Sequence, residues 1–181
     1  MPEEKAGKTY SFDVCLQCKP SCCQDAKPPL TKKRIQIIKE YLKNHGEDAE
    51  QVFTHSEYSF PSVDSDEFCV FYNKETKKCR IHEVKPETCR AGPVTFDINR
   101  RTKKIEWFLK TRELCLFAGK LFDAPEKLKE HLEAAKPEIM KLICELEAQD
   151  LRAILERDEP QTFKIGEDPL PQKVAVKLGL E

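Results

Sequence analysis

Cysteine is the residue type in this chain whose number and spacing could do chemistry. Four of the nine cysteines lie within nine residues, in a C-x2-C-x3-C-C arrangement formed by Cys15, Cys18, Cys22 and Cys23. A C-x2-C pair brings two sulfurs close enough to share one metal ion. The later cysteines follow singly, at Cys69, Cys79, Cys89, Cys115 and Cys144. The pattern predicts a scaffold that brings the early cluster and later cysteines together around a metal centre.

The metal ligands that this pattern predicts are almost all thiolates. The four histidines follow no zinc-finger spacing, and the H-E-x-x-H motif is absent. His82 follows Cys79 by three residues and is the imidazole that could join the site, with an uninvolved strand histidine as the alternative. Thiolate-only sites select zinc or iron–sulfur clusters and disfavour magnesium and calcium. Because four cysteines satisfy one zinc ion or one cluster, seven or eight indicate two centres, or one centre with spare thiols.

The expected compartment is the cytoplasm. No apolar run is as long as a membrane-spanning helix requires, so no membrane association is predicted. The residues Met1-Pro2-Glu3-Glu4-Lys5 lack the apolar region of a signal peptide. Nine is an odd number of cysteines, which excludes a fully paired intramolecular disulfide framework. In a reducing cytosol, cysteines at short spacings indicate metal or redox chemistry.

Charge is unevenly distributed along the chain. The net charge of −1 argues against a global field that would attract nucleic acid. Residues 74–112 carry twelve Lys or Arg and five Asp or Glu, a net charge of +7, whereas residues 123–159 carry six and eleven, a net charge of −5. These segments are either solvated surfaces or, for the basic one, a patch that binds an acidic partner.

A helix and two strands are expected between the early cysteine cluster and Cys79. Thr31 predicts the start of a helix that runs to about Asn44, because it is a good N-cap and the apolar residues that follow share one helical face. Residues 50–60 and 67–72 have the composition of strands.

A β-hairpin is predicted to bring Cys69 and Cys79 within reach of one metal ion. Its strands are residues 68–72 and 79–82, joined by a polar turn. Residues 84–90 are then expected to form a proline-led turn that ends at Cys89. The following residue, Arg90, could hold the Cys89 thiolate or pair with a carboxylate.

A second hairpin and a helical region are expected in the rest of the chain. The hairpin pairs residues 94–98 with 105–109 across a basic turn, and it places Trp107 in the core. A helix is predicted from about residue 126 to about residue 157, kinked or restarted at Pro137. Cys144 lies at the edge of its apolar stripe, which favours a small buried thiol over a ligand. Residues 174–178 could form a short strand.

These elements predict an α+β fold, with a small cysteine-rich metal-binding core built on β-hairpins and followed by a C-terminal helical segment. The expected organisation is a metal-binding domain over residues 10–118, a helical extension packed on it over residues 119–159, and a proline-rich tail over residues 160–181.

The ordered cysteine motifs resemble the YkgJ-like cysteine-cluster family. They are the C-x2-C-x3-C-C cluster, the run Cys79-Arg80-Ile81-His82 and the run Lys85-Pro-x-x-Cys89-Arg90, and the resemblance covers residues 12–118. It implies a zinc- or iron-chelating domain, with a related cluster in flagellin lysine N-methylase. It also implies that seven cysteines are metal ligands: Cys15, Cys18, Cys22, Cys23, Cys69, Cys79 and Cys89.

Two positions depart from the family pattern. Family members often have arginine where this chain has Lys85, and a late C-P-G-like element is replaced by Leu114-Cys115-Leu116. Cys115 is therefore an eighth candidate ligand whose role the resemblance leaves open.

Three classes of function are compatible with the sequence. The first is a metal-binding protein that holds an iron–sulfur cluster or zinc. The second is a cluster-dependent redox or methyl-transfer enzyme, although G-x-G-x-x-G, the P-loop, G-x-S-x-G and C-x3-C-x2-C are all absent and no catalytic residue can be assigned. The third is a zinc-stabilised module that binds nucleic acid or a protein through the basic segment.

Overall fold

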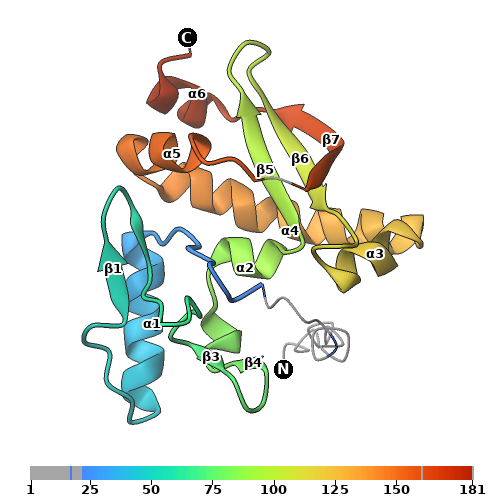
Figure 1. Cartoon of the computed structure of the whole chain (residues 1–181). Helices are drawn as coiled ribbons and strands as arrows, with labels where there is room; N and C mark the ends of the chain where they lie inside the picture. The colour runs from blue at the N-terminus through green and yellow to red at the C-terminus, as the bar shows by residue number, and fades with distance from the viewer. Residues whose placement is uncertain (1–16, 18–21, 160, 181) are drawn as a thin grey trace, which may run out of the picture.

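The computed structural model describes residues 17, 22–159 and 161–180 of the chain. Helices and small antiparallel sheets alternate along it, which confirms the expected α+β class. Within the described residues, the buried apolar side chains form two separate cores. One core surrounds helix α1 and the short hairpins that follow it, and the larger one lies between a three-stranded sheet and helix α4 (Figure 1).

Helix α1 (Lys32–Asn44) organises the smaller core. It begins where the sequence predicted, because the Thr31 hydroxyl accepts a hydrogen bond from the Arg34 N–H at 3.0 Å. It ends before Gly46, whose φ of +70° is a conformation that glycine adopts without strain. The fully buried residues of this core come from α1 and from the segments around it: Leu30, Ile38, Leu42, Phe71 and Ile81.

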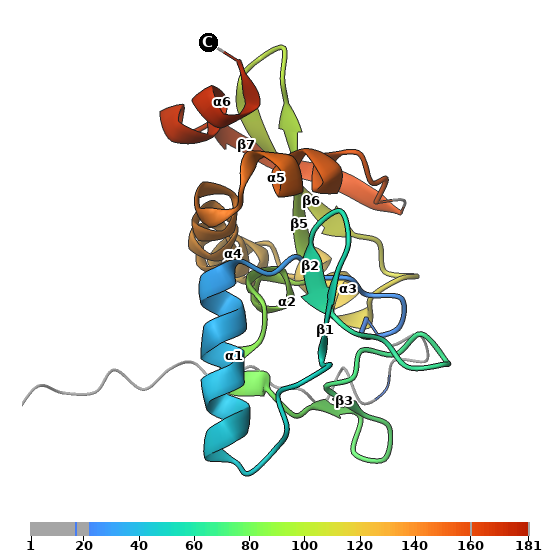
Figure 2. The same cartoon turned by 90° about the vertical axis from the view of Figure 1, so that its left-hand side faces the viewer.

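Two short hairpins pack beside α1. Strands β1 (Phe53–His55) and β2 (Ser59–Pro61) form the first, and β3 (Tyr72–Asn73) and β4 (Lys78–Cys79) form the second. In Figure 2 both lie on the same side of α1. One strand is expected over residues 50–60, but most of this stretch belongs to the β1–β2 hairpin. Of the strand expected over residues 67–72, only Tyr72 belongs to a named strand, β3.

Two short helices follow the second hairpin, the 3₁₀ helix η2 (His82–Val84) and helix α2 (Glu87–Ala91). The prediction of a simple turn over residues 84–90 is thus wrong. Pro86 caps α2, and its fixed φ of −55° suits the start of a helix. Helix α2 lies between α1 and α4, next to both cores (Figures 1 and 2).

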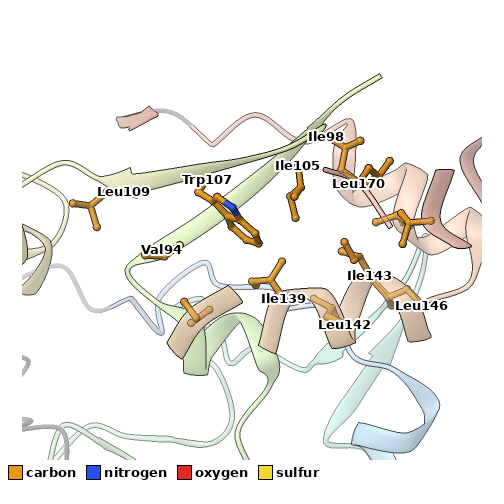
Figure 3. Close-up of a cluster of buried hydrophobic side chains, with 14 of the residues drawn as sticks. Val94, Ile98, Ile105, Trp107, Leu109, Ile139, Leu142, Ile143, Leu146 and Leu170 are labelled. Atoms are coloured by element: carbon orange, nitrogen blue, oxygen red, sulfur yellow. The ribbon is translucent and has the colours of Figure 1, made fainter. Parts of the chain in front are cut away.

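The larger core is built on a sheet with the order β5-β6-β7. Strands β5 (Val94–Asn99) and β6 (Lys104–Lys110) form the predicted second hairpin. Alternate residues of β6, namely Ile105, Trp107 and Leu109, are fully buried on one face of the sheet. Helix α4 (Pro125–Glu145) covers that face with Ile139, Leu142 and Ile143 (Figure 3).

Helix α4 runs through Pro137 as one helix, so the proline neither ends nor restarts it. Buried residues before the proline, His131 and Ala135, and after it, Ile139 and Leu142, keep both halves on the same core. The remaining helices of the larger core are α3 (Leu116–Phe122), α5 (Ala148–Leu155) and α6 (Gln172–Leu178). None of the helices in the described ranges is both long and apolar enough to span a membrane.

The C-terminal segment contributes to the larger core. Strand β7 (Thr162–Pro169) pairs with β6 as the third strand of the sheet, and α6 follows it. The expected strand over residues 174–178 is wrong, because this stretch is helical and buries the adjacent residues Val174 and Ala175. A hydrogen bond at 2.6 Å from the Trp107 indole N–H to the Asp168 carboxylate ties β7 to β6.

Candidate metal centre

Cys23 and Cys69 are joined through their backbones. The Cys69 N–H donates to the Cys23 carbonyl at 2.8 Å, and the Asp25 N–H donates to the Glu67 carbonyl at 2.7 Å. These bonds form a short antiparallel pairing in which Gln24 faces Phe68. The pairing brings the end of the early cysteine cluster to a cysteine 46 positions later in the sequence.

Cys22 and Cys23 lie in a turn that leads into this pairing. Cys15 and Cys18, the other members of the early cluster, lie outside the described residues.

Cys69 and Cys79 flank the second hairpin without pairing across it. Cys79 faces Tyr72 in the ladder, and the Tyr72 N–H donates to the Cys69 carbonyl at 2.8 Å, so Cys69 lies in the turn before strand β3. Each thiol accepts a hydrogen bond from the backbone N–H two residues later, Cys69 from Phe71 and Cys79 from Ile81. Such bonds stabilise the thiolate form that a metal requires.

Cys89 lies in α2 and completes the cluster that the structure describes. Its thiol is within electrostatic reach of Cys22, Cys69 and Cys79, and Cys23 is within reach of Cys69 and Cys89. Five predicted ligands from three separate segments therefore share one region of the protein: Cys22, Cys23, Cys69, Cys79 and Cys89.

The environment keeps most of these thiols neutral in the absence of a cation. Burial raises the pKa of Cys69 to about 11 and also raises the pKa of Cys79. For Cys89, desolvation by the surrounding protein and the negative charges of Cys22, Cys69 and Cys79 also raise the pKa. Neighbouring thiolates repel one another, so several of them can ionise together only if a positive centre compensates their charge.

Cys22 is the exception among the described thiols. A hydrogen bond from the Cys23 thiol, and then the positive charges of Lys110 and Lys85, lower the pKa of Cys22 to about 6, although partial desolvation of this exposed thiol acts in the opposite direction. The Cys22–Cys23 hydrogen bond and burial conversely raise the pKa of Cys23. One thiolate is thus already favoured in the cluster at neutral pH.

The donor atoms of the described cysteines fit zinc or iron, which prefer thiolate ligands. No group of three or more Cys, His, Asp or Glu side chains in the described part of the chain is arranged to hold one ion. A complete centre would therefore need small side-chain movements or the two cysteines outside the described residues. The side chains at positions 15 and 18 remain predicted ligands.

The other candidate ligands are placed as follows. Cys115 is the N-cap of α3, where its sulfur accepts a hydrogen bond from the Ala118 N–H at 3.5 Å, and its ligand role remains a prediction. His82 lies in η2, and burial together with the positive charges of Lys85 and Arg90 lowers its pKa. Cys144 packs against the larger core, as expected for a small structural thiol.

Two basic residues near the candidate site have partners that the structure identifies. Arg90 pairs with the Glu138 carboxylate of α4 at 3.0 Å, which is the second of the two roles open to it. Lys110, at the end of β6, was not anticipated as a neighbour of Cys22. No sequence signal identifies it, because 88 positions separate the two residues and only the fold brings them together.

Comparison with known proteins identifies the same cysteine-rich part of the chain. A family model described as "CxxCxxCC: Putative zinc- or iron-chelating domain" matches residues 14–116. This chain has three residues between its second and third cysteines, one more than the family's CxxCxxCC pattern. An "Uncharacterized protein MJ0661" of Methanocaldococcus jannaschii is 31% identical over 130 residues, which cover 64% of this chain and 70% of that protein. No solved structure matches the chain.

Proposed function

Since this chain belongs to the CxxCxxCC family of zinc- or iron-chelating domains, we propose that it is a metal-binding protein whose clustered cysteine thiolates hold an iron–sulfur cluster or zinc. Family membership supports metal chelation in general. The identity of the centre and of its ligands is our proposal, and it extends the family resemblance that the sequence motifs indicated.

One observation carries the proposal: the fold gathers cysteines from three separate segments in a single region, with Cys69 bound through its backbone to Cys23 at 2.8 Å. The turn at residues 22–23, the β3–β4 hairpin and α2 each contribute to it. Neutral thiols do not need to gather in this way, whereas a metal replaces their protons and cancels the repulsion between the thiolates. The proposed ligands are Cys15, Cys18, Cys22, Cys23, Cys69, Cys79 and Cys89, with Cys115 as an eighth candidate.

An iron–sulfur cluster is our first choice of centre and zinc the second. Seven or eight cysteines exceed the four that one zinc ion uses, and no histidine stands at a zinc-finger spacing. When bound, either centre would supply a positive charge that the thiolates share and a cross-link between the segments that carry them. The chain itself contributes backbone N–H donors to Cys69 and Cys79 and the positive charges of Lys85 and Lys110.

Anaerobic purification followed by elemental analysis and an absorption spectrum tests the proposal. We expect iron and inorganic sulfide in a coloured protein, or zinc in stoichiometric amount in a colourless one. A protein that binds neither metal, and that does not take up zinc or a reconstituted cluster, would refute it. The Cys144→Ser variant is the matched control, because this thiol packs against the larger core and should leave the metal content unchanged.

A further inference from the structure

Helix α2 positions a proposed ligand but is too short to be stable alone. It has five residues, Glu87–Ala91, and carries Cys89 at its centre. Isolated helices of this length do not form in water, because the nucleation cost exceeds the gain from so few hydrogen bonds. The direction in which Cys89 points therefore depends on what surrounding elements impose on α2.

A buried ion pair fixes the first turn of α2. Both the Nε and the Nη2 atoms of Arg34 donate to Oε1 of Glu87, at 2.9 and 2.6 Å. The Arg34 side chain is 6% exposed and the Glu87 side chain 1% exposed. Arg34 also donates from Nη1 to the Val84 carbonyl at 3.3 Å, just before α2. One arginine of α1 thus holds both the entry to α2 and its first residue.

The other end of α2 is tied to α4. The His131 Nε2–H donates to the Ala91 and Gly92 carbonyls, each at 3.1 Å, while Arg90 pairs with Glu138. The α4 contacts therefore fix the end of α2. At its beginning, the Arg34–Glu87 pair connects α2 to the core that surrounds α1, and Lys141 of α4 lies 3.7 Å from the same Glu87 oxygen.

The helical geometry links the orientation of Glu87 to that of Cys89. Successive residues of an α-helix are rotated by about 100°, so positions two apart point to nearly opposite sides. Glu87 faces Arg34 of α1, and Cys89 is consequently directed away from it, toward the other cysteines. A rotation of α2 that followed loss of the ion pair would turn the Cys89 sulfur away from the cluster.

Stability alone does not explain a buried ion pair at this place. The cost of removing two charges from water often cancels their attraction, and apolar residues of similar size commonly serve folding as well. A charged pair instead fixes direction, because two N–H groups of one rigid guanidinium converge on the single oxygen Oε1 of Glu87, which only a narrow range of side-chain orientations allows.

From these contacts we infer that Arg34 and Glu87 are positioning residues for the metal ligand Cys89. The inference rests on the proposed function, since it assigns the pair a role in the affinity of the metal centre. Loss of the pair should weaken metal binding even when the protein remains folded.

The test measures metal affinity in variants of the full chain. Zinc is titrated into metal-free protein in competition with a chromophoric chelator, and cobalt(II) absorption reports the number of thiolates bound. Glu87→Gln should lower the zinc affinity about 10- to 100-fold, the range typical of groups that orient metal ligands. Its sulfur-to-cobalt absorption should also be weaker than that of the native chain.

Two further variants separate positioning from folding. Trp107→Phe removes the indole donor to Asp168 in the larger core but leaves the contacts of Arg34 and Glu87 in place, so it should retain native zinc affinity and cobalt absorption. The double variant Arg34→Met/Glu87→Leu removes both buried charges, so it should fold even where Glu87→Gln does not. It should show the same loss of affinity as Glu87→Gln.

Each result has a defined meaning. Native zinc affinity in either the folded Glu87→Gln variant or the double variant would overturn the positioning role and leave the proposed function standing. An equal loss of affinity in Trp107→Phe would also overturn it, because the effect would then follow stability in general. If the native chain bound neither zinc nor cobalt, the proposed function itself would fail.

Discussion

The substitution Cys69→Ser offers a sharp test of the metal centre, because the backbone around this residue is fixed independently of its sulfur. The Cys69 N–H binds the Cys23 carbonyl and the Cys69 carbonyl binds the Tyr72 N–H, both at 2.8 Å. Burial raises the pKa of the Cys69 thiol to about 11, so this thiol is neutral at pH 7 in the metal-free protein. Serine therefore changes one atom and no charge in that state.

The expected effect is large only when metal is bound. A structural zinc site with four ligands supplies roughly 10–16 kcal/mol of apparent binding energy, so one ligand corresponds to about 2.5–4 kcal/mol. For a chain of this size, 1 kcal/mol shifts Tm by about 2–4 °C, which predicts a decrease of roughly 5–16 °C. In the metal-free protein only the hydrogen bond from the Phe71 N–H is altered, and the loss should stay within about 1 kcal/mol.

The assay is thermal unfolding of native and Cys69→Ser proteins, each with and without metal, followed by circular dichroism. The difference between the two Tm shifts isolates the contribution of sulfur to metal binding. Equal destabilisation with and without metal would mean that Cys69 serves packing alone. No destabilisation in the metal-loaded protein would remove Cys69 from the ligand set.

Three other predictions concern the early cluster and the larger core. Cys15→Ser and Cys18→Ser should each lower the metal content and the Tm, and unchanged metal stoichiometry in both would exclude these ligands. Trp107→Phe removes the donor to Asp168 and should cost about 1.5–3 kcal/mol in denaturant unfolding without loss of metal. Although burial opposes ionisation of Asp168, hydrogen bonds from Lys136 and Trp107 lower its pKa below 3.8, so its contribution is present above about pH 4 and lost on acidification. Asp168→Asn should therefore destabilise the protein at pH 7, and the difference from the native chain should shrink as pH falls below about 4; a constant difference would contradict this origin.

Elements that depend on local signals could be predicted from the sequence. Thr31 and Gly46 mark the two ends of α1 through a hydroxyl cap and a positive φ, and both signals act within a few residues. The β5–β6 hairpin follows from alternating apolar residues, and the same alternation places Trp107 in the core.

Elements that depend on distant partners could not be predicted in the same way. Strand β7 exists because β6 offers it an edge, and its own sequence contains Gly166 and Pro169, which weaken a strand signal. Residues 174–178 contain alternating valines that suggest a strand. In the structure they are helical, and Val174 and Ala175 pack together into the larger core.

In the candidate site, too, local signals could be predicted from the sequence and distant partners could not. The cysteine motifs identified the candidate ligands, because their spacing is a local property of the sequence. The groups that orient or polarise these ligands come from elsewhere in the chain. Arg34 reaches Glu87 across 53 positions, and Lys110 acts on Cys22 only because the fold brings the end of β6 near the turn that contains Cys22.

Metal-dependent protection of thiols tests the shared centre most directly. Native protein, with and without metal, is alkylated briefly and each modified cysteine is mapped by mass spectrometry. Cys22 lies at the surface of the described structure, so it should react readily in the metal-free protein and be protected when metal is bound. The predicted result is protection of the clustered cysteines with no change at Cys144; equal modification of Cys22 with and without bound metal would contradict a thiolate-held centre.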